Sequence, residues 1–173
     1  MRFFFPLVLL FTAIGLSIYA YLGGLRTPTT ALETTTAPVL LAGQPFHGKV
    51  SDAAFGELFR AAKRWQEVQP TPPPLANIYY NDPGLAHDSI RAFVGVVVTD
   101  TATQLPAGWH YYQVPAGQRV AVARLAAASY LVAPGKLEAA VEQAIKAAGL
   151  RKQPPYLEQF GPGEASELRV GVK

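Results

Sequence analysis

The sequence contains no cysteine, only three histidines and few charged side chains. Without cysteine there can be no disulfide, thiolate metal site or cysteine nucleophile. His47, His87 and His110 lack the spacing of metal ligands, and no nucleotide-binding glycine motif occurs, so neither a metal nor a cofactor is predicted. Charged residues make up 16% of the chain, and no stretch concentrates Lys and Arg. Nucleic-acid binding, which requires a concentrated basic patch, is therefore not predicted.

The N-terminus is strongly apolar, with no charged residue between Phe3 and Leu25. A helix of this length reaches roughly 30 Å, enough to cross the hydrocarbon core of a bilayer. A cleavable signal peptide is the alternative, but its apolar core is normally ~7–15 residues long and ends in a small-x-small site. Tyr19-Ala20-Tyr21 is not such a site. Residues 1–25 are therefore predicted to be an uncleaved transmembrane anchor, crossing through residues 3–25.

The residues that flank the anchor indicate its orientation and where the folded domain begins. Arg2 precedes the apolar run, and Arg26 after it is offset by Glu33. The positive-inside rule then favours a single-pass membrane protein whose soluble domain lies on the exported, periplasmic side. Residues 26–36 are rich in Thr and Pro and are expected to form an extended linker, which leaves 37–173 as the folded domain.

Strand-like and helix-like patterns alternate along residues 37–173. Apolar stripes at spacings of three and four predict one helix from Phe55 to Trp65 and another after Pro134. Strands are predicted at 38–42, 76–80, 91–98, 109–114, 119–125, 156–160 and 167–172, with turns at 81–84 and 161–163. The predicted fold class is therefore α+β. Duplicated βαββ halves form one antiparallel sheet with two helices on one face, and the other face is expected to be concave and open.

The sequence resembles the GyrI-like small-molecule-binding domain family. The resemblance lies in the two βαββ halves, in Ile78-Tyr79-Tyr80-Asn81-Asp82-Pro83 of the first half, and in the strand of the second half that carries Glu158. The family, also described as SOUL/gyrase-inhibitor-like, includes the effector-binding domains of multidrug-responsive regulators. The anchor, the first strand with Gly48 and Arg91-Ala92-Phe93-Val94-Gly95 look closest to bacterial relatives of the testis-expressed ER-phagy receptor. That receptor's autophagy-binding motif lies in a long C-terminal tail, and because this sequence stops at Lys173 its autophagy role is not carried over.

The resemblance implies a cleft between the two halves that accepts aromatic or cationic organic ligands. The family's acidic ligand contact lies in a Glu-x-Tyr pattern on the penultimate strand, which Glu158-Gln159-Phe160 matches except for Phe in place of Tyr. Strand alternation places Tyr156, Glu158 and Phe160 on one face, where a carboxylate between aromatic rings suits an organic cation. The alternative is that Glu158 is an ordinary strand residue that faces solvent and has no role in binding. Tyr79 and Trp109 are further candidates for the ligand-binding wall, although strand aromatics are more often structural.

Three functions follow from these residues. The leading hypothesis is a membrane-anchored domain that binds a small organic ligand through Glu158. The first alternative is a hydrolase of electrophilic, cyclopropanoid-type small molecules, with Glu158 as the catalytic general base; the absence of a tyrosine hydroxyl at Phe160 counts against it. The second alternative is a membrane-tethered adaptor for a protein partner, which a cleft filled by side chains would favour.

Overall fold

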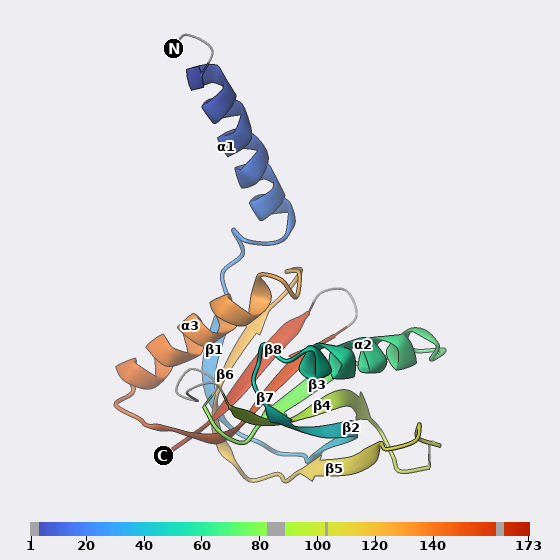
Figure 1. The fold of residues 1–173 in the computed structure, drawn as a ribbon. Helices are drawn as coiled ribbons and strands as arrows, with labels where there is room; N and C mark the ends of the chain where they lie inside the picture. Colours follow the sequence, from blue (N-terminus) through green and yellow to red (C-terminus); the bar gives the residue numbers. More distant parts are fainter. Residues whose placement is uncertain (1–3, 83–88, 103, 162–164) are drawn as a thin grey trace.

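The computed structural model describes residues 4–82, 89–102, 104–161 and 165–173. These residues form three helices and one antiparallel eight-stranded sheet (Figure 1). The helices are α1 (Phe4–Tyr21), α2 (Ala53–Glu67) and α3 (Ala133–Ala147). The strands are β1 (Thr29–Thr34), β2 (Val39–Gly48), β3 (Leu75–Tyr79), β4 (Ile90–Val98), β5 (His110–Val114), β6 (Arg119–Leu125), β7 (Lys152–Phe160) and β8 (Ser166–Val172). Some residues named in the sequence analysis lie outside the described residues. They are Phe3 of the predicted anchor, Pro83 and Gly84 of the first predicted turn, His87, and Pro162 and Gly163 of the second predicted turn.

The sheet confirms the predicted α+β class and the duplication. Its strand order is β1-β6-β8-β7-β3-β4-β2-β5, so the halves β2-α2-β3-β4 and β6-α3-β7-β8 meet at the central pair β3–β7. Each half receives an outer strand from the chain that precedes the other half: β1 pairs with β6, and β5 pairs with β2. The central pair is therefore the junction of the two repeats.

Both helices pack on the same face of the sheet, as the apolar stripes predict (Figure 1). The α2 helix buries Phe55 and Ala62 against strands of the first half, and α3 buries Leu137, Val141 and Ile145 against strands of the second. Each helix covers the strands of its own repeat. The central pair β3–β7 consequently lies under the gap between α2 and α3.

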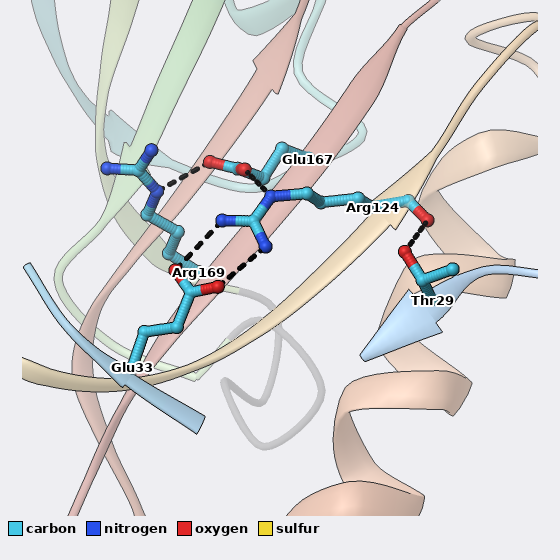
Figure 2. A network of polar contacts seen from close by, with 5 residues as sticks. All are labelled: Thr29, Glu33, Arg124, Glu167 and Arg169. Carbon is cyan, nitrogen blue, oxygen red and sulfur yellow. Dashed lines mark hydrogen bonds and ion pairs between the residues drawn. The ribbon is translucent and has the colours of Figure 1, made fainter. Parts of the chain in front are cut away.

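The segment expected to be an extended linker contains strand β1. Figure 2 shows how this strand is held: the Arg124 guanidinium of β6 donates to both carboxylate oxygens of Glu33, at 2.7 and 2.9 Å. Its Nε donates to Glu167 of β8 at 2.6 Å, and Glu167 also accepts from Arg169 at 2.5 Å. This four-residue network joins three neighbouring strands. It also raises the pKa of Arg124 and lowers that of Glu33, chiefly through the hydrogen bonds between them.

The sheet face opposite the helices is curled and filled, which corrects the expectation of an open concave face. Five strands lie between β1 and β2, a distance of ~29 Å at ~4.8 Å per strand if the sheet were flat. The chain from Thr34 to Val39 reaches at most ~18 Å, so the sheet must curve to bring these strands together. Inside the curve Leu41, Ile78 and Leu157 are buried in one apolar cluster, and a cavity beside Leu157 measures only about 10 Å³.

The α1 helix projects from the domain, and none of its residues is buried (Figure 1). Its 18 residues have a mean hydropathy of 1.9, and all of them are exposed. At ~1.5 Å per residue the helix is ~27 Å long, close to the ~30 Å thickness of a hydrocarbon core. It is the one helix in the described part of the chain that is long and apolar enough to cross a membrane.

Candidate functional site

Polar side chains line the helix-facing side of the central strand pair. The register places Asn77 opposite Glu158 and Tyr79 opposite Tyr156, so these four side chains form adjacent cross-strand pairs on one face. Neither α2 nor α3 lies directly above the central strand pair. Polar side chains can therefore occupy this part of the sheet without disrupting the apolar core beneath each helix. Glu158 therefore faces the gap between α2 and α3 and not the curled face.

These residues form part of a small acidic pocket of about 110 Å³. Its walls come from both repeats: Tyr79 and Asp82 from β3 and the turn after it, and the remainder from α3, β7 and β8. Four carboxylates and one ammonium line it, namely Asp82, Glu138, Glu142, Glu158 and Lys152. The floor is apolar, built by Val141, Leu168 and Val170. An excess of carboxylates above an apolar floor favours an organic cation on electrostatic grounds.

Glu158 is a carboxyl group of this pocket that is largely shielded from solvent. Burial raises its pKa above the ordinary value of 4.5, and the nearby Glu138 adds to the rise. Asn77 and the Tyr79 hydroxyl, both beside the carboxylate, act in the opposite direction. The same surroundings raise the pKa of Tyr79, first through burial and then through the charge of Glu158. A carboxyl group in this setting is suited to binding a cation or to exchanging a proton.

The amide of Asn77 is a second unusual feature. Its side chain is only 1% exposed, and neither its nitrogen nor its oxygen has a partner with hydrogen-bond geometry among the described residues. The group lies near enough to Glu158 to affect its pKa, although the contact falls short of a well-formed hydrogen bond. An unsatisfied buried amide costs about 1–3 kcal/mol. Buried polar groups of this kind are normally satisfied by a protein partner, an ordered water or a bound ligand.

Lys152 bridges the carboxylates at the edge of the pocket. Its Nζ lies 2.9 Å from Asp82 and 2.7 Å from Glu142, and the Tyr156 hydroxyl donates to Asp82 at 3.4 Å. Burial acts to lower the pKa of Lys152, but its hydrogen bonds to Glu142 and Asp82 outweigh this effect and raise it. On the other side of the bridge is a shallow groove of about 650 Å³ that shares Asp82, Glu142, Lys152 and Tyr156 with the pocket. The bridge thus separates a small pocket from a wide groove.

The structure brings three of the five candidate ligand contacts together. Tyr79, Tyr156 and Glu158 line the pocket. Phe160 lies on the same strand but packs at the margin of the α3 core. Trp109 is remote from the pocket, because its ring packs against Trp65 of α2 at a centroid distance of 5.7 Å.

Asp82, Glu138, Glu142, Lys152 and Asn77 are site residues that sequence reasoning missed. On either side of the turn after β3, the chain is joined by Asn81: its side-chain amide donates to the Ser89 carbonyl, and its side-chain oxygen accepts from the Arg91 backbone amide. The spacing of Glu138 and Glu142, one helical turn apart beside the Leu137–Val141 stripe, was the one signal available in the sequence. The position of Lys152 depends on the β7 register, which the sequence does not display.

Comparison with known proteins identifies the fold but no sequence family. No protein-family model and no curated protein matches the sequence. Among solved structures, an integron cassette protein of Vibrio cholerae aligns with a TM-score of 0.60 over 85% of this chain and 96% of its own, at 10% identity. The C-terminal domain of EcmrR aligns with a TM-score of 0.54 over 86% and 98%, also at 10% identity. EcmrR in a DNA complex gives 0.57, and the match spans 57% of that longer chain.

A structure described as a hydrolase from Listeria innocua also aligns, with a TM-score of 0.52 at 10% identity over 86% of this chain and 92% of its own. The chain shares the fold of the integron cassette protein and of the EcmrR C-terminal domain. The closer resemblance to ER-phagy receptor relatives stays a prediction.

Proposed function

We propose that the chain is a membrane-anchored GyrI-like domain that binds a small organic cation in the pocket at the junction of its two repeats. The observation that carries the proposal is the shielded Glu158 carboxyl, raised in pKa and without a paired cation among the described residues, at the centre of an acidic pocket. The effector-binding fold and the apolar α1 helix support it.

The dimensions of the site narrow the ligand class. A pocket of about 110 Å³ is well below the ~300–1,000 Å³ of typical ligand sites, so it suits a compact cationic head group. The adjoining groove of about 650 Å³ contains the apolar Ile145, Leu150 and Pro154 and can receive an aromatic or aliphatic body. We therefore expect an amphipathic cation, with its head near Glu158 and its body across the Lys152 bridge.

Calorimetric titration of the full chain in a mild non-ionic detergent tests the proposal. Benzylamine, a cation near pH 7, is compared with benzyl alcohol, a neutral molecule of similar size. We expect the cation to bind and Glu158→Gln to weaken it at least tenfold, since deleting one partner of a buried charge pair costs about 2–5 kcal/mol. Glu57→Gln, the same exchange on the outer face of α2, is the matched control. Equal affinity for the two probes, or unchanged binding in Glu158→Gln, contradicts the proposal.

A hydrolase is the second candidate, favoured by the Tyr79 hydroxyl beside Glu158. The missing hydroxyl at Phe160 counted against a hydrolase in the sequence analysis. Phe160 does not line the pocket, and Tyr79 supplies a hydroxyl from the neighbouring strand, so this objection is weaker. In this mechanism Glu158 accepts a proton from water as the water oxygen attacks an electrophilic ring carbon. One ring C–C bond breaks, and the departing carbanionic carbon takes up the proton that Glu158 holds. Turnover of an activated cyclopropane diester that Glu158→Ala abolishes supports the hydrolase; binding without turnover contradicts it. The adaptor hypothesis required a filled cleft, and the open pocket gives it no support.

A further inference from the structure

Exposed apolar side chains gather where the anchor helix meets the domain. Tyr21 and Leu25, at and just beyond the end of α1, are 88% and 73% exposed. Tyr130 and Leu131, in the loop between β6 and α3, are 71% and 69% exposed. We refer to these four residues as the collar. Large apolar side chains exposed together mark a contact surface more often than a surface that faces water.

The two segments of the collar are joined through their backbones. The amide of Ser129 donates to the carbonyl of Leu22 at 3.0 Å, and the Lys136 ammonium donates to the carbonyl of Gly24. Gly23 is buried with φ +81°, and a Cβ there would lie only 2.6 Å from the Ala127 carbonyl oxygen. Only glycine permits this close approach. The anchor therefore enters the domain through a packed joint.

The length of α1 places this joint at the surface of a bilayer. The helix is ~27 Å long, slightly shorter than a ~30 Å hydrocarbon core, so its last residue cannot lie far outside that core. Leu22 follows the helix directly and is hydrogen-bonded to Ser129, and Tyr130 and Leu131 follow Ser129. The loop tip is therefore held at the depth of the lipid head groups. Figure 1 shows this loop on the side of the domain from which α1 emerges.

We infer that the collar inserts into the bilayer interface and forms a second membrane contact, which fixes the domain in one orientation on the lipid surface. This inference rests on the proposed membrane anchoring. The chemistry of the collar fits a lipid surface: tyrosine rings suit the boundary between acyl chains and head groups, and Leu131 can enter the acyl region. Arg26 is exposed beside the collar and can contact lipid phosphates.

Nitroxide labelling tests the collar, because a chain without cysteine accepts a single label at any chosen position. Tyr130→Cys, Leu131→Cys, Ile14→Cys and Val68→Cys variants of the full chain are reconstituted in phosphatidylcholine–phosphatidylglycerol vesicles. Ile14 lies within α1, whereas Val68 is 76% exposed at the end of α2. Collision rates with oxygen, which enriches in lipid, are compared with those of a water-soluble nickel chelate.

We expect oxygen collisions to dominate at positions 14, 130 and 131, and nickel collisions to dominate at position 68. If position 14 is in lipid while 130 and 131 match position 68, the collar inference is overturned and anchoring stands. If position 14 is accessible to nickel, the anchoring fails and the collar inference fails with it. Unchanged circular dichroism confirms that each labelled variant is folded.

The joint has its own matched pair of variants. Gly23→Val is blocked by the Ala127 carbonyl, whereas Gly15→Val, in α1, meets nothing within 4 Å. In the Leu131→Cys background, we expect Gly23→Val to shift the label from oxygen towards nickel collisions at least twofold, and Gly15→Val to leave it unchanged. Equal collision ratios in both variants overturn the fixed joint.

Discussion

Replacing Glu158 by glutamine should stabilise the empty protein while weakening cation binding, because one shielded charge governs both. In the folded protein burial, assisted by Glu138, raises the pKa of Glu158 above 4.5, whereas in the unfolded chain the pKa returns to about 4.5. Between these two values the folded state holds a proton that the unfolded state has released. The free energy of unfolding therefore falls as pH rises through this window, by at most about 1.4 kcal/mol per pH unit.

Glutamine has nearly the same shape and no charge to bury. The unfolding free energy of Glu158→Gln relative to the unsubstituted chain should therefore increase from pH 4.5 upward and level off above the folded-state pKa. Cation binding follows the ionised form, so benzylamine affinity of the unsubstituted chain should rise with pH over the same window. In Glu158→Gln both trends should be absent.

Denaturant titrations of the full chain in detergent, from pH 4 to pH 8, measure this difference. The paired Trp65 and Trp109 rings, half-buried between α2 and the sheet edge, report unfolding by fluorescence. Glu57→Gln is the control: its pKa is lowered by Arg60, so its contribution to stability is lost as pH falls and cannot imitate the expected trend. Identical pH dependence in Glu158→Gln and the unsubstituted chain would refute the reasoning, as would a variant that is less stable at every pH.

Three further substitutions test other parts of the site and fold. Lys152→Met removes the ammonium of the bridge and should tighten benzylamine binding several-fold, by about 0.5–1 kcal/mol for a partly exposed pair. The gain in affinity should be smaller at high salt, and calorimetry at two ionic strengths measures it. Trp109→Leu should lower the free energy of unfolding by about 1–3 kcal/mol yet change the benzylamine Kd less than twofold, since its ring contacts Trp65 and not the pocket. Arg124→Gln should accelerate hydrogen exchange of the β1 amides by roughly fivefold, about 1 kcal/mol, without affecting β7.

The elements that the sequence predicted well are those whose signal is local. The Phe55–Trp65 stripe and the stripe from Leu137 each bury one helix face, so periodicity alone located them. Strand β5 was predicted because its aromatic side chains are strand-like. Its counterpart β1 was missed, because Thr29–Thr34 has little to bury and is held by Arg124, 91 residues from Glu33. A swapped pair of outer strands cannot be inferred from either segment alone.

The same distinction between local and distant signals holds at the candidate site. Strand alternation correctly placed Tyr156 and Glu158 on one face, but which face is helix-covered depends on how the two halves join. The bridge unites Asp82, Glu142 and Lys152, and Asp82 lies 70 positions before Lys152. Such a cluster exists only once the β3–β7 register is set. The division at residues 26 and 37 and the periplasmic location stay predictions.

The central pair combines two features that a stable core would avoid. Glu158 is shielded enough to raise its pKa, and the ammonium nearest the pocket, Lys152, is engaged by Asp82 and Glu142. Opposite it, Asn77 keeps both polar atoms without a well-formed hydrogen bond. Leucine at either position would fit the apolar floor and remove these costs, so packing does not explain them. A ligand with a positive charge and hydrogen-bond donors would satisfy the carboxylate and the amide oxygen together. The physical cost of the empty pocket therefore points to the same cationic ligand class as its charge.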